Sequence, residues 1–380
     1  MMYPSVGICS LALSFPSIRL TKDDYKENYP DLLASIEQKN LARLFSLGNF
    51  TPSNEYELEM MPYLEDPFRG TVERWMLGPG ESSLTLEYRA AIDALDAAKL
   101  SPDDVDILLV ASFLPEQIGF GNAAFLARQL GIPCAAWNLD ATCASTPVAL
   151  ETACALVKSG GYRHALVVIS CTYSRFFDQD DTLSWFFSDG AGAFLVSALK
   201  PTQGFLGSKT VNTSVLCDQF PFKLTQDEQG NPHLRMQVLK GTNKVIGETA
   251  VGLLRTCCEG AIAAANVTLE QIDFFIFNTP TAWFANFCIR ILGIDPERTI
   301  NVYPFYANIG PTLSLANLYH AAQLDKIREN DLVLMYGFGA ASSASAIVMR
   351  WGDVTLSPQP HKHPTQNLQK RYEEAQRRTS

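Results

Sequence analysis

Two long stretches of the chain repeat the same order of apolar and polar segments. In residues 101–170, an acidic turn precedes an apolar strand from Ile107 to Val110, a helix, a polar turn, an alanine-rich helix and a second apolar strand. Residues 268–337 show the same order. The two copies lie much farther apart than the ~20–50 residues of a solenoid repeat. The pattern therefore predicts a duplicated α/β half, with two equivalent helix N-termini that can meet at one site.

The duplication also predicts how the chain is divided. We expect a first half over residues 1–200 and a second half over residues 201–355, joined by a polar link over residues 198–240. Residues 21–80 are polar, aromatic and rich in proline, which indicates an insertion of helix and loop rather than core. Residues 356–380 are rich in proline, histidine, glutamine and arginine, and we expect them to form a loose tail.

Composition narrows the class of protein. The chain has 380 residues and a formal net charge of −10, and no dense stripe of lysine and arginine precedes its tail. This argues against nucleic-acid binding, because phosphate groups need clustered cations. No apolar run reaches the ~18–20 residues that span a bilayer, so we expect no membrane association. Nine cysteines without a Cys-x-x-Cys motif indicate free thiols in a reducing cytoplasm, and with five histidines we expect no metal site.

One cysteine stands at a position that favours chemistry. Cys143 follows a strand that ends in Asp140 and precedes a long helix with Pro147 in its first turn. A thiol at a helix N-terminus experiences the positive end of the helix dipole, which stabilises the thiolate. The small neighbours Ala141 and Ala144 leave room for an acyl group. Cys143 is therefore a candidate nucleophile, although a small buried core residue would give the same pattern.

A glycine-containing turn follows the last strand of the second copy. The sequence Gly337-Phe338-Gly339-Ala340-Ala341 resembles a dinucleotide-binding fingerprint, but the chain then passes straight into another strand and no βαβ unit follows. We interpret it instead as a turn whose backbone N–H groups point into a cavity. Such groups can form an oxyanion hole.

Four motifs occur in order between about residues 70 and 352. They are Asp140-Ala141-Thr142-Cys143-Ala144-Ser145, Phe187-Ser188-Asp189-Gly190-Ala191-Gly192-Ala193, Tyr306-Ala307-Asn308-Ile309-Gly310, and Gly337-Phe338-Gly339 followed by Val348-Met349-Arg350-Trp351. Together they resemble the thiolase superfamily and, within it, β-ketoacyl-acyl-carrier-protein synthase III. The resemblance implies a five-layered αβαβα fold made of two duplicated halves, normally a homodimer, which agrees with the repeat.

The resemblance also implies a reaction. In this family an acyl group passes from coenzyme A or an acyl carrier protein to a cysteine, which matches Cys143, and a second substrate is then acylated. The thioester is the substrate, and no cofactor is implied. The family's catalytic asparagine matches Asn308. Its catalytic histidine matches Asn278, within Phe277-Asn278-Thr279-Pro280, so this chain carries asparagine where the family carries histidine.

The asparagine at position 278 limits the chemistry. Its side chain can donate a hydrogen bond, so Asn278 and Asn308 together are expected to polarise a thioester carbonyl, but it cannot take up a proton. The leading interpretation is a ketosynthase III-like acyltransferase of secondary metabolism that forms acyl-Cys143. It would then perform either decarboxylative condensation or transfer to an oxygen or nitrogen acceptor. The alternative is a non-catalytic partner subunit of an active homologue.

The resemblance suggests further site residues with less specific motifs. The backbone N–H group of Ala340, like that of the nucleophile, is a candidate oxyanion donor. Phe120 lies where the family reaches into the partner subunit's acyl channel, and it could equally be a loop aromatic in the dimer interface. Glu116 is either a substitute base acting across the dimer or a solvated loop carboxylate. Arg74 and Trp75 are candidates for contacting the pantetheine or the nucleotide, although Trp75 could serve only in packing.

Overall fold

Two mixed β-sheets form the body of the protein. The computed structural model describes all residues except 1–3, 47–51, 178–180, 227–229, 231 and 359–380. The first sheet has six strands in the order β14-β1-β7-β6-β4-β5. These are β1 (Val6–Ser14), β4 (Ile107–Phe113), β5 (Ala135–Asn138), β6 (Ala165–Thr172), β7 (Asp189–Ala198) and β14 (Thr355–Leu356). β4 runs parallel to β5 and β6, whereas β7 runs antiparallel to β6 and β1.

The second sheet has four strands in the order β11-β12-β13-β8. These are β8 (Gly204–Asn212), β11 (Phe274–Phe277), β12 (Leu332–Phe338) and β13 (Ser343–Arg350). β11 and β12 are parallel, like β4 and β6 in the first sheet. Every residue of β6 and of β12 is buried, as expected for apolar strands covered on both faces.

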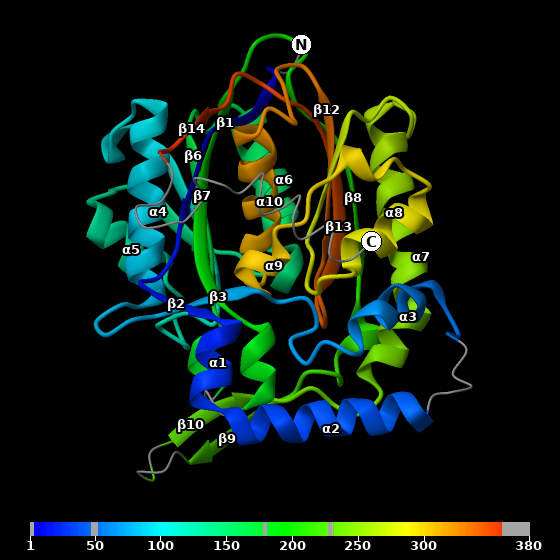
Figure 1. Ribbon diagram of the computed structural model, residues 1–380. Coiled ribbons are helices and arrows are strands. Elements are labelled where there is room, and N and C mark those ends of the chain that lie inside the picture. Colours follow the sequence, from blue (N-terminus) through cyan, green and yellow to red (C-terminus); the bar gives the residue numbers. More distant parts are fainter. Residues whose placement is uncertain (1–3, 47–51, 178–180, 227–229, 231, 359–380) are drawn as a thin grey trace.

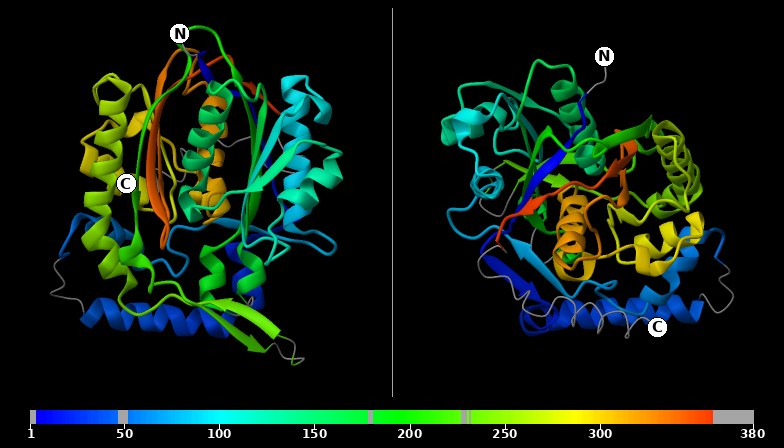
Figure 2. Two further views of the ribbon diagram at one scale, coloured as in Figure 1. Left: turned by 180° about the vertical axis from the view of Figure 1, so that it is seen from behind. Right: turned by 90° about the horizontal axis from the view of Figure 1, so that it is seen from above.

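Helices and sheets alternate in five layers (Figures 1 and 2). α6 and α10 lie between the two sheets, α4 and α5 cover the outer face of the first sheet, and α7 and α8 cover that of the second. These helices are α4 (Ser83–Ala98), α5 (Ala123–Leu130), α6 (Ser145–Lys158), α7 (Thr242–Ala265), α8 (Phe284–Leu292) and α10 (Thr312–Gln323). α10 is buried from Thr312 to Ala321 because it contacts both sheets. The five-layered αβαβα fold is confirmed.

Equivalent helices of the two copies end in the same way. α5 ends at Gly131 and α8 ends at Gly293, and these glycines have φ angles of 72° and 67°. A glycine adopts this left-handed conformation without the steric cost that a side chain would add. The Leu-Gly-Ile sequence at the end of each helix is therefore a true stop signal in both copies.

The insertion is more ordered than the sequence indicates. β2 (Ile18–Thr21) pairs antiparallel with β3 (Glu73–Met76), so the two ends of the insertion meet. The helices between them are α1 (Lys22–Asn28), α2 (Pro30–Ser46) and α3 (Glu55–Met60). Tyr56 of α3 packs against Trp283 and Phe287, with ring centroids 6.1 and 5.7 Å apart. The insertion therefore covers α8 and is part of the folded body.

Two boundary predictions change in the structure. The expected polar link contains β8, which pairs with β13, and a hairpin of β9 (Phe222–Gln226) and β10 (Pro232–Met236). The expected tail starts later than predicted, because Thr355 and Leu356 pair with β1 as β14, and residues 359–380 lie outside the described part of the chain. A two-residue strand has no periodicity that a sequence pattern could detect.

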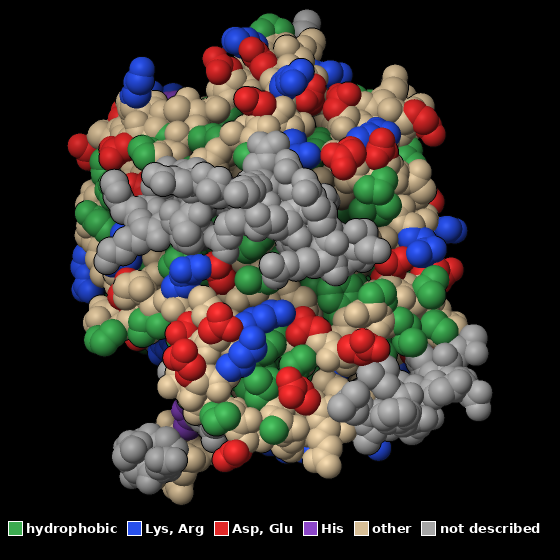
Figure 3. All heavy atoms as spheres, in the orientation of Figure 1, with side chains coloured by type: hydrophobic (Ala, Val, Ile, Leu, Met, Phe, Trp, Pro, Cys, Tyr) green, Lys and Arg blue, Asp and Glu red, His purple; other side chains and the backbone are tan. Residues whose placement is uncertain are grey.

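The surface of the protein carries charges of both signs. On the face shown in Figure 3, acidic and basic side chains are intermingled. Within the described residues, no helix is long and apolar enough to cross a bilayer.

Candidate active site

The two equivalent helix N-termini meet between the sheets. Thr146, in the first turn of α6, donates a hydrogen bond from its hydroxyl to the carbonyl oxygen of Pro311, at the start of α10, over 2.8 Å. Cys143 lies immediately before α6, in a 3-10 turn over Thr142–Ala144. Asn308 lies in the turn that leads into α10, which begins at Thr312. The duplicated fold therefore brings the two candidate residues into the same interior layer.

A strained residue precedes each of these two positions. Thr142 has a φ angle of 50° and Ala307 has a φ angle of 52°, a region that residues with side chains rarely adopt. The N–H group of Thr142 donates to Asp140 Oδ1 over 2.7 Å, and a β-bridge between Phe187 and Asn308 holds the residue after Ala307. Such strain costs on the order of 1–3 kcal/mol and persists where surrounding contacts fix the backbone. The nucleophile and the asparagine are thus held in defined orientations.

The Cys143 thiol is half-buried in the folded protein. Burial raises its pKa to about 12, although a hydrogen bond from the Tyr173 side chain lowers it and the Asp140 carboxylate raises it. This direction is opposite to the sequence-based expectation of a stabilised thiolate, and loss of hydration is its main cause. The candidate nucleophile is then a neutral thiol near pH 7 in the free protein, and it would lose its proton as it attacks.

Asn308 is held by the turn that begins α10. Its Oδ1 accepts a hydrogen bond from the N–H group of Gly310 over 2.8 Å, and its backbone N–H donates to the carbonyl of Phe186 over 2.9 Å. The residue is 7% exposed. Because Oδ1 faces Gly310, the NH₂ group is the part of this side chain that can donate to a substrate.

Asn278 follows the last residue of β11 and is fully buried. Its backbone N–H donates to the carbonyl of Tyr336, and its Nδ2 donates to the carbonyl oxygen of Gly310, both over 2.8 Å. Its Oδ1 has no hydrogen-bond partner among the described residues. The Gly310 carbonyl takes one of the two N–H groups of this NH₂, so the expectation that the NH₂ group polarises a thioester carbonyl stays a prediction.

Gly310 forms hydrogen bonds with both asparagines and lies beside Cys171 and Tyr173. Its N–H group donates to Asn308 Oδ1, and its carbonyl oxygen accepts from Asn278 Nδ2. Its φ angle is 57°. A Cβ at this position would lie 2.8 Å from Cys171 Sγ and 3.6 Å from the Tyr173 ring. Only glycine fits this conformation and this space. Gly310, which bonds both asparagines, therefore lies beside Tyr173, whose side chain forms a hydrogen bond with the candidate nucleophile.

Tyr173 and Cys171 are site residues that the sequence did not reveal. Tyr173 follows β6 and packs against Phe113 and Phe187, with ring centroids 5.6 and 4.5 Å apart. Cys171 is fully buried, and burial raises its pKa well above the ordinary value. Both lie at the end of the buried strand β6, and no motif in the sequence distinguishes them from core residues.

The glycine-containing turn packs directly on the nucleophile's turn. A Cβ on Gly339 would lie 2.3 Å from Thr142 Oγ1, and the Thr142 hydroxyl donates to the carbonyl of Ala340 over 3.1 Å. Ala341 has a φ angle of 56°, whereas Ala340 does not have a positive φ. A backbone N–H donor at Ala340 therefore survives without glycine, and its role as an oxyanion donor stays a prediction.

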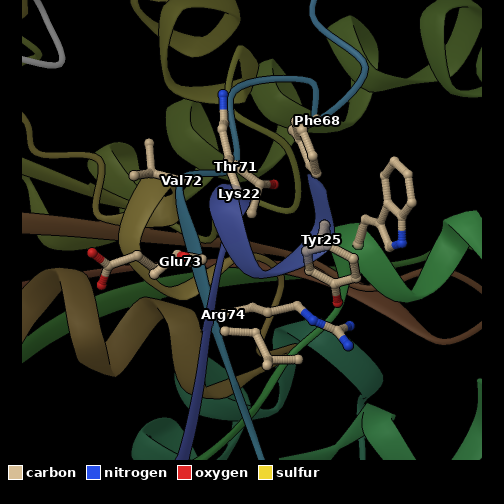
Figure 4. A pocket seen from close by; sticks show the side chains of 10 residues that line it. Lys22, Tyr25, Phe68, Thr71, Val72, Glu73 and Arg74 are labelled. Atoms are coloured by element: carbon tan, nitrogen blue, oxygen red, sulfur yellow. The ribbon is translucent and has the colours of Figure 1, made fainter. Parts of the chain in front are cut away.

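The two residues expected to contact the donor's pantetheine or nucleotide are buried. Arg74 is 2% exposed, donates to the carbonyl of Phe187 over 3.2 Å and lies 5.1 Å from the ring centroid of Tyr25 (Figure 4). Trp75 Nε1 donates to the carbonyl of Phe305 over 3.2 Å. Both therefore anchor the insertion, and their contact with the donor stays a prediction.

Glu116 and Phe120 lie on a loop outside this site. Glu116 forms an ion pair with Arg175 over 2.9 Å. Phe120 is 81% exposed and Ile118 is 74% exposed. Their roles across a dimer stay predictions. Within the described residues, no group of three or more His, Cys, Asp or Glu side chains could hold a metal ion.

Comparison with known proteins identifies the family. The family model for 3-oxoacyl-[acyl-carrier-protein] synthase III matches residues 137–214, and the model for its C-terminal part matches residues 262–351. A β-ketoacyl-[acyl-carrier-protein] synthase III of Gloeobacter violaceus is 31% identical over 292 residues, which cover 74% of this chain and 88% of that protein. The chain belongs to the 3-oxoacyl-[acyl-carrier-protein] synthase III family. A second relative, of Chelativorans sp., is also a β-ketoacyl-[acyl-carrier-protein] synthase III.

Solved structures show the same fold. The synthase III of Thermus thermophilus has a TM-score of 0.73 and 23% identity, over 92% of this chain and all of that one. A histidine-to-asparagine variant of OleA from Xanthomonas campestris has a TM-score of 0.73 and 18% identity, again over 92% of this chain and all of that one. The synthase III fold is therefore shared along nearly the whole chain.

Proposed function

We propose that this protein is an acyl-thioester-dependent acyltransferase that forms an acyl-Cys143 intermediate and passes the acyl group to a second substrate. The observation that supports the proposal is that the helix following Cys143 contacts the start of α10 through Thr146 and Pro311, and that α10 is preceded by Gly310, which bonds both buried asparagines. The donor is an acyl-CoA or an acyl carrier protein, as the names of the relatives suggest. Synthase III chemistry uses these thioesters without a cofactor.

Each group has a role in the proposed reaction. The neutral Cys143 thiol attacks the donor's carbonyl carbon, the carbon–sulfur bond of the donor breaks, and the departing thiolate takes the proton. The Asn308 NH₂ and the backbone N–H groups of Cys143 and Ala340 stabilise the negative oxygen that develops. The Tyr173 hydroxyl stabilises the sulfur while it carries charge, since a hydrogen bond lowers the pKa of the thiol.

A specialised role fits this chain better than the initiation of fatty-acid synthesis. The histidine position holds Asn278, and the ordered insertion covers α8. We therefore assign the protein to secondary metabolism in the cytoplasm. A homodimer is supported by the exposed Ile118 and Phe120 and by the half-exposed Trp137 on β5, which forms the open edge of the first sheet.

A non-catalytic partner subunit is the second candidate. Two observations favour it: the Cys143 thiol is neutral, and the residue at position 278 is an asparagine, which cannot act as a base. Against it stands the hydrogen bond from Tyr173 to Cys143, which favours the thiolate and would serve no purpose in a subunit without a nucleophile.

Intact-protein mass spectrometry after incubation with a panel of acyl-CoAs and acyl carrier proteins separates these candidates. We expect a mass increase of one acyl group that is lost in Cys143→Ala and kept in Cys217→Ala, which changes an exposed cysteine. Retention of the adduct in Cys143→Ala would disprove the assignment of the nucleophile. The absence of any adduct, alone or with a co-purified homologue, would favour the partner subunit.

A further inference from the structure

The Asn278 side chain has one defined orientation. Its Nδ2 donates to the Gly310 carbonyl oxygen over 2.8 Å. Rotating the amide by half a turn would bring Oδ1 against that carbonyl, and two acceptors facing each other repel. Oδ1 is therefore the atom on the other side of the amide. It is buried and has no partner among the described residues. A buried acceptor without a donor is unfavourable, and the cost disappears when a donor arrives.

We propose that the second substrate of this site is an amine whose N–H group donates to Asn278 Oδ1, so that the acyl group is transferred to nitrogen. This inference rests on the proposed function, because it requires the acyl-Cys143 intermediate. It assigns the class of the acceptor, which the family alone leaves open between a carbanion, an oxygen and a nitrogen nucleophile.

Decarboxylative condensation does not match this arrangement. Loss of carbon dioxide from a malonyl thioester creates a negatively charged enolate oxygen, which needs hydrogen-bond donors. An unpaired acceptor oxygen at Asn278 repels such an oxygen. The Asn308 NH₂ can donate, but its natural target is the carbonyl oxygen of the acyl group on Cys143. The two asparagines therefore differ in what they add: Asn308 Oδ1 is paired and leaves its NH₂ group as a donor, whereas Asn278 has an unpaired acceptor oxygen beside its second N–H group.

Nitrogen is favoured over oxygen because the uncharged form of an amine needs no base in the site, once its ammonium form has lost a proton to water. An uncharged amine attacks with its lone pair, whereas a hydroxyl generally needs a base, and an asparagine cannot serve as one. The nitrogen bonds to the acyl carbon, and the bond between that carbon and Cys143 Sγ breaks with its electron pair on sulfur. The proton from nitrogen passes to Sγ and restores the thiol. Burial raises the pKa of this thiol to about 12, so the departing sulfur takes the proton readily.

Discharge of a preformed acyl-enzyme tests the assignment. Acyl-Cys143 protein is mixed separately with n-butylamine, n-butanol and malonyl-CoA, and the loss of the adduct, the product and any carbon dioxide are measured. We expect n-butylamine to remove the acyl group about tenfold or more faster than it reacts with the same acyl group on N-acetylcysteamine, an effect of the size of one buried hydrogen bond. Butanol and malonyl-CoA should leave the adduct in place.

Two variants separate this role from a structural one. In the fraction of Asn278→Leu that carries the adduct, the acceleration by n-butylamine should be lost. Asn278→His offers an N–H donor, and it should release more carbon dioxide from malonyl-CoA than the natural protein. Carbon dioxide release by the natural protein, faster discharge by n-butanol, or no acceleration by n-butylamine would each overturn the amine assignment. A natural protein that forms no acyl adduct would overturn the proposed function itself.

Discussion

The Tyr173 hydroxyl forms a hydrogen bond with the thiol of Cys143, the candidate nucleophile. The tyrosine ring is held by aromatic neighbours, with centroids 4.5 Å from Phe187 and 6.4 Å from Phe177. Burial raises the pKa of Tyr173 well above its ordinary value, so the phenol stays protonated and acts as a donor. In a site without the family's histidine, this phenol is a polar group that can support charge on sulfur.

Removing this hydroxyl should slow acylation. In Tyr173→Phe the sulfur loses a donor, and a hydrogen bond to a charged group contributes about 1.5–3 kcal/mol. We expect the rate of acyl-enzyme formation to fall roughly 10- to 100-fold, while the ring keeps its packing and the melting temperature changes little. Mass spectrometry of samples quenched at successive times measures this rate. Tyr88→Phe, which changes an exposed tyrosine of α4, is the matched control. An unchanged rate would show that the phenol does not act on the sulfur.

The reactivity of Cys143 should keep rising with pH. Its pKa of about 12 means that the thiolate fraction increases about tenfold per pH unit through the range in which a free thiol with a pKa near 8.5 levels off. We expect the rate of iodoacetamide modification at Cys143, followed by peptide mass spectrometry, to show no plateau between pH 7 and pH 10. N-acetylcysteine in the same buffers provides the reference. A plateau below pH 9 would mean that the helix dipole outweighs burial after all.

The sequence predicted the architecture better than the details of the site. The repeated order of segments and the glycines at the ends of α5 and α8 are local signals, so the layers and the meeting of two helix N-termini were predictable. The partners of Asn278 and Cys143 were not. The orientation of the Asn278 amide depends on the Gly310 carbonyl, which lies far away in sequence. The pKa of Cys143 depends on how completely the surrounding layers exclude water, and no spacing of residues reports that.

Gly310 should be more sensitive to substitution than other glycines with a positive φ angle. Gly310 and Gly131 both have a positive φ, so alanine costs about 1–2 kcal/mol of backbone strain at each. At Gly131 the added Cβ meets no atom within 4 Å, whereas at Gly310 it would lie 2.8 Å from Cys171 Sγ. We therefore expect Gly310→Ala to destabilise the protein more than Gly131→Ala in urea unfolding, and to reduce acyl-enzyme formation specifically. Equal losses at the two positions would show that the contact with Cys171 is relieved by a small shift.

The ionisation of two buried side chains should change the free energy of unfolding with pH in opposite directions. His320 bonds Tyr306 through Nε2 over 2.7 Å, and burial lowers its pKa from 6.5 to about 4. Its neutral form therefore stabilises the fold above pH 6.5, and this contribution, about 3 kcal/mol, is lost as the pH falls towards 4. Asp189 is fully buried, and burial raises its pKa from 3.8 to about 6. Its contribution is complete below pH 3.8 and is lost as the pH rises through 6.

Urea unfolding at pH 7 and at pH 4.5 distinguishes these contributions. In His320→Gln, which keeps an acceptor for the Tyr306 hydroxyl, the loss of unfolding free energy between pH 7 and pH 4.5 should be smaller than in the natural protein. In Asp189→Asn the loss should be larger, because the group that gains stability on acidification is absent. His164→Gln replaces a histidine that is only partly buried and bonds Ser197, and it serves as the control. If both buried-site variants changed the pH dependence in the same direction, the assignment of these opposite signs would be wrong.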